Sequence, residues 1–346
     1  MSFSFGFSGE DVEDDNDVAQ DVTATAQSNG GESGSPFVGL PAKEHSLDEL
    51  LATLPDHLCY STIQIESPTG KTINLPRRDL SDIRVQLMAE DEAANDSTLH
   101  DLEDSDIRTG VYEGGFKTWE CSVDLASILL DRGPRKDIDE LVRCDQIIEL
   151  GCGTAVPTLT LFQHCLQSSI PQSFTLQDYN DSVLRLATLP NLLLTWATTT
   201  TPPLISPTDP QNDLELTPEI LAAFRASLTE ANISLTFLSG SWSPDLAALI
   251  PASAPEMGTL VLGAETIYSP AATDAFVEIL MLLLRRVKMA KAMVGAKKFY
   301  FGVGGSVDGL KEACAARGAV AYEIENHGVP GLEAGVGRAL VEVQMF

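Results

Sequence analysis

The sequence predicts an α/β fold with a seven-stranded, mostly parallel sheet, helices on both of its faces and an antiparallel C-terminal strand. Seven short apolar runs occur after residue 145, and helical stretches follow the first five. This alternation is typical of a parallel sheet that is covered on both faces. The last two runs have no helix between them, which indicates a closing antiparallel hairpin. Such an ending is unusual for a dinucleotide-binding fold.

The expected strands follow in chain order. They are residues 146–151, 173–179, 234–240, 258–265, 297–304, 321–328 and 338–346. Ahead of them, apolar residues recur at helical spacing after Trp119 and predict a helix there. The most apolar stretch, "AFVEILMLLLRRVK", is too short to span a membrane and is expected to be a buried amphipathic helix.

Composition divides the chain into three parts. Residues 1–36 contain eight acidic residues and no Lys or Arg, so we expect a disordered acidic N-terminus. Residues 37–110 contain short strand-like pieces and are expected to be a partly ordered extension. The α/β domain then covers residues 111–346, and the Thr- and Pro-rich segment 197–217 is expected to be a surface insertion.

The charge balance limits the partners. With 22 basic and 50 acidic residues the net charge is −28, which disfavours direct binding to nucleic acid and favours a basic protein partner. The basic cluster from Arg285 to Lys298 is expected to be a solvated helix face. Six cysteines without a CxxC pair indicate no metal site. Without an export signal or membrane segment, we expect a monomer in the cytoplasm and nucleus.

The first apolar run ends in a glycine-rich turn, "ELGCGTAVP". Gly151 and Gly153 match the first two glycines of a nucleotide-binding turn, but Val156 stands in the third position. Glu149, at the end of the strand, would repel a pyrophosphate and attract a cation. Asp178 ends the next run about 25 residues later, where nucleotide-binding folds hold a ribose diol.

These residues predict a nucleoside ligand that carries a positive charge and no phosphate, and S-adenosylmethionine fits this description. The alternative is an ordinary strand-to-helix turn with incidental acidic residues. Trp119 and Trp242 lie beside expected strand ends, where rings either pack on a ligand or belong to the core. Glu265 and Tyr268 end the fourth run, where a methyl-accepting group would enter.

Several segments resemble, in order and spacing, the histidine protein methyltransferase family. They are "YEGGFKTWECSVDL", "IIELGCGTAVPTL", "LQDYN", "TLPN", "SGSWS", "ETIYSP" and "YFGVGG". The resemblance covers roughly residues 111–346 and implies a Rossmann-like methyltransferase sheet. It also implies transfer of a methyl group from S-adenosylmethionine to a histidine, at the tele nitrogen, of a large-subunit ribosomal protein.

The turn chemistry and the resemblance together give a set of expected cofactor-binding residues. They are Lys117, Thr118, Trp119, Glu120, Cys121, Glu149, Gly151, Gly153, Asp178, Tyr179, Asn180, Gly240, Ser241, Trp242 and Ala264. The chain departs from the family at two of these positions. The family often has an acid at Ser241 and commonly has Ser at Ala264, so local hydrogen bonds differ there.

The expected catalytic residues are Glu265, Asn180 and Tyr268. Histidine is mostly neutral at pH 7, so the enzyme mainly needs a group that accepts the N–H of the non-reacting nitrogen. Glu265, Asn180 or a backbone carbonyl is a candidate for this acceptor. Two alternatives stay open: a lysine methyltransferase of the same fold, and a non-catalytic escort of a basic ribosomal protein.

Overall fold

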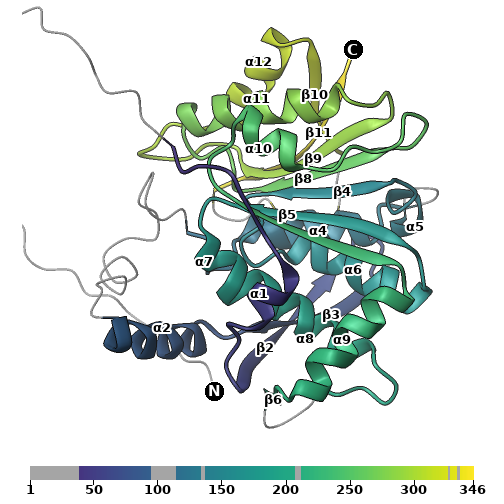
Figure 1. The fold of residues 1–346 in the computed structure, drawn as a ribbon. Helices are drawn as coiled ribbons and strands as arrows, with labels where there is room; N and C mark the ends of the chain where they lie inside the picture. Colours follow the sequence, from purple (N-terminus) through teal and green to yellow (C-terminus); the bar gives the residue numbers. More distant parts are fainter. Residues whose placement is uncertain (1–38, 95–113, 134–136, 207–211, 326–327, 333–335) are drawn as a thin grey trace, which may run out of the picture. The chain divides into compact units, whose positions relative to one another are not determined.

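A computed structural model describes residues 39–94, 114–133, 137–206, 212–325, 328–332 and 336–346 (Figure 1). The acidic segment predicted for residues 1–36 lies outside the described residues. The predicted boundary between an N-terminal extension and the α/β domain stays a prediction.

The helices and strands have the following bounds. The helices are α1 (Leu47–Leu51), α2 (Leu80–Ala94), α4 (Glu120–Leu130), α5 (Ile138–Leu141), α6 (Val156–Ser168), α7 (Asp181–Val183), the π-helical η1 (Leu184–Thr188), α8 (Leu189–Thr199), α9 (Pro218–Glu230), α10 (Pro244–Leu249), α11 (Pro270–Leu284) and α12 (Val307–Ala316). The strands are β1 (Lys43–His45), β2 (His57–Glu66), β3 (Thr72–Arg78), β4 (Gln146–Leu150), β5 (Gln172–Asp178), β6 (Asp213–Glu215), β7 (Ile233–Ser239), β8 (Thr259–Ala264), β9 (Ala290–Lys297), β10 (Ala319–Glu323) and β11 (Arg338–Met345).

The main sheet has the strand order β1-β7-β5-β4-β8-β9-β11-β10. Strands β7, β5, β4, β8 and β9 are parallel to one another, and β11 is antiparallel to both β9 and β10. The predicted fold class and the closing antiparallel hairpin are confirmed. An eighth strand, β1, pairs antiparallel with β7 at the edge of the sheet. The sequence analysis missed it because three residues are too few to show a periodic pattern.

The predicted strand at residues 297–304 is wrong, because the fifth parallel strand is β9, which ends at Lys297. The following residues form turns, and Gly302 and Gly304 have φ angles of 82° and 87° that extended backbone does not adopt. Its aromatic residues made the segment look like a strand. The predicted basic helix face is also wrong, because α11 ends at Leu284 and Lys291 and Lys297 lie in β9.

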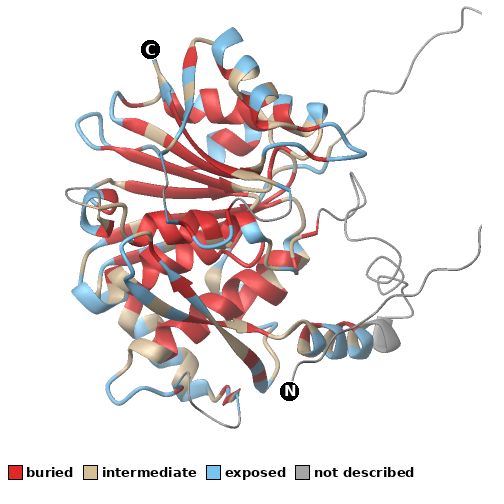
Figure 2. Ribbon diagram, turned by 180° about the vertical axis from the view of Figure 1, so that it is seen from behind, coloured by how far each residue is buried: buried red, intermediate tan, exposed pale blue. Residues whose placement is uncertain are grey.

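The strands are buried on both faces, as expected for a parallel sheet between helices. On β4, Ile147 packs into a core with α4, α6 and α8, whereas the next residue, Ile148, packs into a core with α10, α11 and α12. Figure 2 shows the buried colour running through the sheet and through the inner faces of these helices. Consecutive residues therefore face opposite cores, which fixes the register of the sheet.

A second sheet, in the order β3-β2-β6, packs against α8 and α6. Its strand β6 lies within the predicted insertion 197–217 and pairs with β2. Strands from before and after the glycine turn are thereby joined in one layer (Figure 1). Within the part of the chain that the structure describes, no helix is long and apolar enough to cross a membrane.

Candidate active site

The predicted site segments converge at the edge of the main sheet where the parallel strands end. The strand order reverses at β4, which has β5 on one side and β8 on the other. Ligands of open α/β sheets bind outside the carboxyl ends of the strands at such a reversal. The turns after β4, β5, β7 and β8 all carry predicted residues. Figure 1 shows this edge on the left, beside α7.

The glycine turn after β4 is approached closely by neighbouring protein atoms. Gly151 and Gly153 have φ angles of 64° and 51°, in the left-handed region that favours glycine. A Cβ atom on Gly153 would lie 3.1 Å from the carbonyl oxygen of Gly115, and one on Gly151 would lie 3.2 Å from Thr266 Cγ2. The turn therefore needs glycine both for its backbone angles and for the close approach of its neighbours.

Glu149 is the last acidic residue before the turn, and its side chain is only 1% exposed. Its Oε2 accepts a hydrogen bond of 3.0 Å from the backbone N–H of Thr158, in the first turn of α6. Burial raises the pKa of this carboxyl from 4.5 to about 8. The structure thus shows Glu149 bound to the start of a helix, while its predicted contact with the cofactor stays a prediction.

Asp178 joins the end of β5 to the glycine turn. Its Oδ2 accepts a hydrogen bond of 2.9 Å from Gly153 N–H, and its Oδ1 accepts one of 3.3 Å from Asn180 N–H. Its backbone oxygen and that of Tyr179 both accept from Gly240 N–H at 3.2 Å. The turns after β4 and β5 are therefore joined at the Asp178 carboxylate, and backbone oxygens of Asp178 and Tyr179 hold the turn after β7.

Gln177 is a site residue that the sequence analysis missed. Its Oε1 accepts hydrogen bonds from Trp242 Nε1 at 2.7 Å and from Gly151 N–H at 3.2 Å. Its Nε2 donates to the carbonyl oxygen of Gly240 at 3.0 Å. A polar residue inside the buried run "SFTLQD" was the available signal, because a buried amide must find partners.

The segment before β1 lies on the turn after β7. Ser241 N–H donates to the carbonyl oxygen of Leu40 at 3.0 Å, and a Cβ atom on Gly240 would collide with the carbonyl oxygen of Pro41. The Ser241 hydroxyl is buried without a hydrogen-bond partner among the described residues. At this departure from the family, neighbouring backbone thus covers the serine.

The residues before α4 lie across the glycine turn. The hydroxyls of Thr118 and Thr154 are 3.1 Å apart, and Trp119 Nε1 donates to the carbonyl oxygen of Gly114 at 3.0 Å. Trp119 is the N-cap residue of α4, and Cys121 in the first turn of that helix is fully buried. The predicted stretch from Lys117 to Cys121 therefore reaches the cofactor edge of the sheet.

Glu265 follows Ala264 at the end of β8 and has a left-handed φ of 59°. Such a conformation is uncommon for a glutamate and points to a fixed functional geometry. Tyr300 Oη donates a hydrogen bond of 2.6 Å to Glu265 Oε2. The other oxygen, Oε1, is buried and has no hydrogen-bond partner within the described ranges. The carboxylate is thus held in place by the protein, and burial followed by the charge of Glu265 raises the pKa of the neighbouring Cys121 thiol.

Tyr300 was also missed, because it lies in the run that was wrongly predicted as a strand. Burial, followed by the charge of Glu265, raises the pKa of its hydroxyl far above the ordinary value. The hydroxyl is therefore a permanent donor to Glu265. Lys297, at the end of β9, places its Nζ 5.5 Å from the Trp119 ring centre and 5.9 Å from that of Tyr300.

The three predicted catalytic residues lie on different strand ends. Asn180 follows β5 and Glu265 follows β8, with β4 between them. Two strand spacings separate their backbones by about 10 Å, and the role of each residue as acceptor of the imidazole N–H stays a prediction. Tyr268 is partly buried beside α11, and its backbone oxygen accepts from Gly305 N–H at 3.1 Å.

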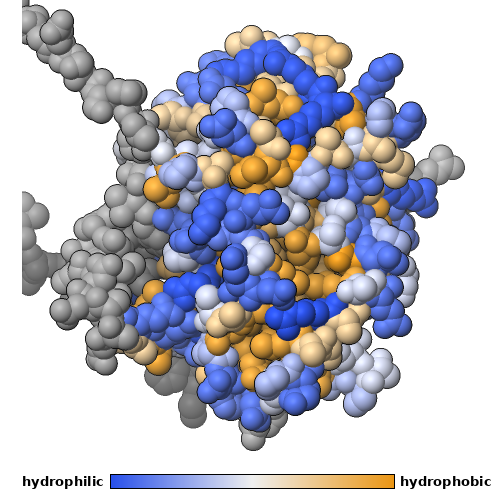
Figure 3. Space-filling view, in the orientation of Figure 1, coloured by the Kyte–Doolittle hydropathy of each residue, from blue (hydrophilic) through white to orange (hydrophobic). Residues whose placement is uncertain are grey.

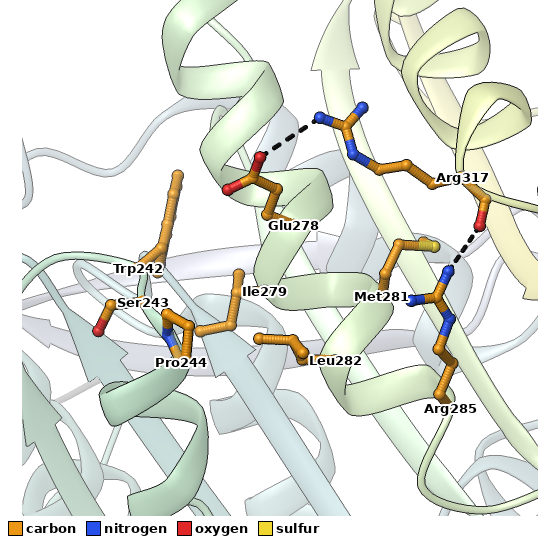
Figure 4. A pocket seen from close by; sticks show the side chains of 9 residues that line it. All are labelled: Trp242, Ser243, Pro244, Glu278, Ile279, Met281, Leu282, Arg285 and Arg317. Atoms are coloured by element: carbon orange, nitrogen blue, oxygen red, sulfur yellow. Dashed lines mark hydrogen bonds and ion pairs between the residues drawn. The ribbon is translucent and has the colours of Figure 1, made fainter.

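A separate pocket of about 330 Å³ lies between α10, α11 and α12 (Figure 4). Trp242 and Ile279 line one side, and Arg317 forms an ion pair of 3.5 Å with Glu278 on another. Figure 3 shows apolar surface over α10 and α11 among mostly hydrophilic residues. We place the candidate active site at the strand ends instead, because Asp178 and Glu265 do not line this pocket. In the described part of the chain no residue cluster suits a metal ion.

The fold and the site define a Rossmann-like methyltransferase. The strand order, the glycine turn with Val156 in place of the third glycine and the acid at the end of the second parallel strand all belong to this class.

Comparison with known proteins gives the family, although no family model matches the chain. The chain is similar to Histidine protein methyltransferase 1 of Saccharomyces cerevisiae, with 34% identity over 346 residues and 89% of each chain covered. It is 37% identical over 309 residues to the Schizosaccharomyces pombe protein of that name, covering 88% of this chain and 82% of the relative. The chain belongs to the histidine protein methyltransferase family, and the predicted resemblance is confirmed.

A solved structure of a TehB-like SAM-dependent methyltransferase from Corynebacterium glutamicum is a more distant match. It has a TM-score of 0.33 and 10% identity, and covers 64% of this chain and 88% of its own. The family membership makes the chain a methyltransferase, and S-adenosylmethionine is its methyl donor. The residues present fit this donor, because the carboxylate of Asp178 lies beside the glycine turn at the carboxyl ends of the parallel strands.

Proposed function

We propose that this chain transfers a methyl group from S-adenosylmethionine to the tele nitrogen of a histidine in a large-subunit ribosomal protein. The observation that carries the proposal is the position of Glu265 at the end of β8, with a left-handed φ of 59° and a carboxylate that Tyr300 holds at 2.6 Å. In the proposed complex this carboxylate accepts an imidazole N–H. The names of the curated relatives support histidine as the acceptor.

The turns after β4, β5 and β7 would hold the donor. Asp178 would accept the ribose hydroxyls, Gly151 and Gly153 would pass under the methionine part, and Trp242 with Gly240 would flank the adenine. When bound, S-adenosylmethionine supplies a methyl group on a cationic sulfur that is open to attack by a nucleophile. The residues from Lys117 to Cys121 would close the site on the side of α4.

Glu265 would orient the acceptor. Its Oε1 accepts the N–H of the pros nitrogen, which leaves the lone pair of the tele nitrogen directed at the methyl group. Tyr300 keeps the carboxylate in place by its hydrogen bond to Oε2. After transfer the ring is cationic, and the pros proton leaves through Glu265 Oε1 to solvent. A neutral imidazole is already the main form at pH 7, so this chemistry needs orientation more than deprotonation.

The acidic surface supports a basic protein substrate. A net charge of −28 attracts a free ribosomal protein and repels the RNA of an assembled ribosome. We therefore propose a monomeric enzyme in the cytoplasm and nucleus that modifies its substrate before or during assembly, without binding nucleic acid directly or associating with a membrane.

The test is single-turnover methylation of large-subunit ribosomal proteins from cells that lack this enzyme. Glu265→Ala should slow transfer by about 10²–10⁴-fold, and Glu265→Gln should keep partial activity because its amide oxygen still accepts the N–H. Calorimetry should show unchanged cofactor affinity for both variants. Glu256→Gln, at an exposed site, controls for the loss of a charge.

Mass spectrometry of the product separates the alternatives. Methyl-histidine at the tele nitrogen supports the proposal, whereas methyl-lysine would identify the lysine methyltransferase of the same fold. Near wild-type rates for Glu265→Ala would remove Glu265 from the reaction. Cells rescued fully by Glu265→Ala, with no methylated product, would favour the non-catalytic escort.

A further inference from the structure

The loop after β9 exposes a group of apolar side chains next to the candidate active site. Phe299, Phe301 and Val303 are 44%, 75% and 54% exposed. The two phenylalanine rings pack edge to face with their centres 5.0 Å apart, so they form one apolar surface. We call these three residues the aromatic ridge. The loop projects from the sheet edge where β9 ends (yellow-green, left in Figure 1) and is exposed in Figure 2.

The aromatic ridge is fixed in place relative to Glu265. Tyr300, between the two phenylalanines, points inward and donates its hydroxyl to Glu265. Its backbone N–H donates to Gly305 oxygen at 2.9 Å, and its backbone oxygen accepts from Gly304 N–H at 2.9 Å. Gly305 N–H then donates to Tyr268 oxygen at 3.1 Å. The loop is thus fastened to the segment that carries the proposed catalytic carboxylate.

The fold does not need this apolar surface. The side chains of Phe299, Phe301 and Val303 are exposed, and polar side chains there would leave the buried Tyr300 and the backbone hydrogen bonds unchanged. Contiguous exposed apolar groups usually mark a binding surface. We propose that the aromatic ridge binds the substrate polypeptide beside its target histidine, and that it selects a large apolar side chain there. This inference rests on the proposed function.

The occupant follows from the position of the surface. Tyr300 links the ridge to Glu265, so a chain whose histidine approaches Glu265 from the side of this loop passes beside Phe299 and Phe301. An extended chain advances about 3.3–3.6 Å per residue, which places the selected side chain within about three residues of the histidine.

The experiment uses labelled 13-residue peptides that contain Gly, Ser and Lys, one central histidine and one leucine at each position from −4 to +4. Fluorescence polarisation measures their binding to the full chain with S-adenosylhomocysteine present. A leucine within about three residues of the histidine should tighten binding about tenfold over the leucine-free peptide, as expected for one buried anchor. Phe299→Ser and Phe301→Ser should each reduce this gain, and the double variant should abolish it.

The matched control is Phe346→Ser. Phe346 is 86% exposed and follows β11 at the opposite edge of the same sheet, where Gln344 is paired with Lys291. This variant should still bind the leucine-containing peptides more tightly than the leucine-free peptide. The inference is overturned if no leucine position tightens binding, or if the gain survives in the double variant. A wild-type dimer in sedimentation that Phe301→Ser dissociates would assign the ridge to a second copy of the chain.

The same peptides, incubated with S-adenosylmethionine, test the proposed function separately. If leucine tightens peptide binding only when the aromatic ridge is intact, and no methyl-histidine forms, the result would support the docking surface and contradict histidine methylation. If methyl-histidine forms equally well with the wild type and the double variant, and leucine does not tighten peptide binding, the proposed function would stand and the docking surface would be ruled out.

Discussion

The buried carboxyl of Glu149 makes the stability of this protein fall as the pH rises, and a single substitution removes this contribution. Its pKa is raised from 4.5 to about 8, mainly because burial disfavours the charged form. In the unfolded chain the carboxyl ionises near 4.5, whereas in the folded protein it keeps its proton until about pH 8. Between these values the folded state binds more protons, so stability falls as the pH rises.

The size of the effect follows from the shift of about 3.5 pH units. Each unit corresponds to about 1.36 kcal/mol, so Glu149 removes up to about 5 kcal/mol of folding free energy above pH 8. Glu149→Gln keeps an oxygen that accepts Thr158 N–H and cannot ionise. Relative to wild type, the variant should gain stability steadily from pH 5 to pH 8 and show no further gain above that.

The assay is urea unfolding of both proteins at pH 5, 6, 7, 8 and 9, with the difference in free energy plotted against pH. Glu312→Gln, at an exposed position of α12, controls for the loss of an ordinary surface charge. A difference that stays constant across this range would refute the reasoning, because it would show that Glu149 ionises normally in the folded protein.

The cofactor provides a second measurement on Glu149. A cationic ligand beside the carboxyl favours its ionised form, so binding of S-adenosylmethionine near pH 7 should release a proton. S-adenosylhomocysteine lacks the charge on sulfur and should release fewer protons. Calorimetry in buffers with different ionisation enthalpies measures both values, and Glu149→Gln should make them equal.

Further predictions concern the turns that hold the cofactor. Gly153→Ala places a Cβ atom 3.1 Å from a carbonyl oxygen at a φ of 51°, so calorimetry should show cofactor binding weakened about tenfold or more; Gly153→Arg should abolish it. Asp178→Ala should weaken cofactor binding by about 1–3 kcal/mol, and unchanged affinity would exclude it from the site. Gln177→Leu leaves Trp242 Nε1 and two backbone groups without their partner, so urea unfolding should show a loss of about 1–3 kcal/mol per buried group. Deleting residues 1–36 should slow turnover on a basic substrate at low salt and have little effect at high salt, and an equal loss at every ionic strength would contradict steering by charge.

The sequence predicted the parts of the fold that depend on local pattern. Strands β4, β5, β7 and β8 are bounded by polar residues or glycine, and each was placed to within about two residues, the usual uncertainty of strand ends. Strand β9 was misplaced because "AKAMVGAK" has few β-branched or aromatic residues, whereas the following turn is aromatic. Pairing with β8 and β11 and packing against α4 make β9 a strand, and these contacts are not visible in a local window.

In the candidate site, too, the residues marked by a local sequence pattern were predicted, and those that act through contacts between distant segments were missed. Gly151, Gly153, Asp178 and Glu265 were predicted because each follows an apolar run, and strand ends of a parallel sheet meet at one edge. Gln177 and Tyr300 were missed because their importance lies in contacts between distant segments. Gln177 reaches the turn after β7, more than 60 residues away in the chain, to accept from Trp242. No spacing rule relates such residues.

These contacts also explain how one site can hold the methyl donor and its proposed acceptor at a fixed distance and orientation. The turns after β4, β5 and β7 form the adenosine half, and Glu265 with Tyr300 forms the acceptor half. Trp119 belongs to both, because its Nε1 donates to Gly114 above the glycine turn while its ring lies beside Lys297 at the end of β9. A shift of the segment before α4 therefore moves both halves together. Since in-line methyl transfer depends on alignment of the acceptor nitrogen, methyl group and sulfur, this shared element fits the need of the reaction better than two independent binding sites would.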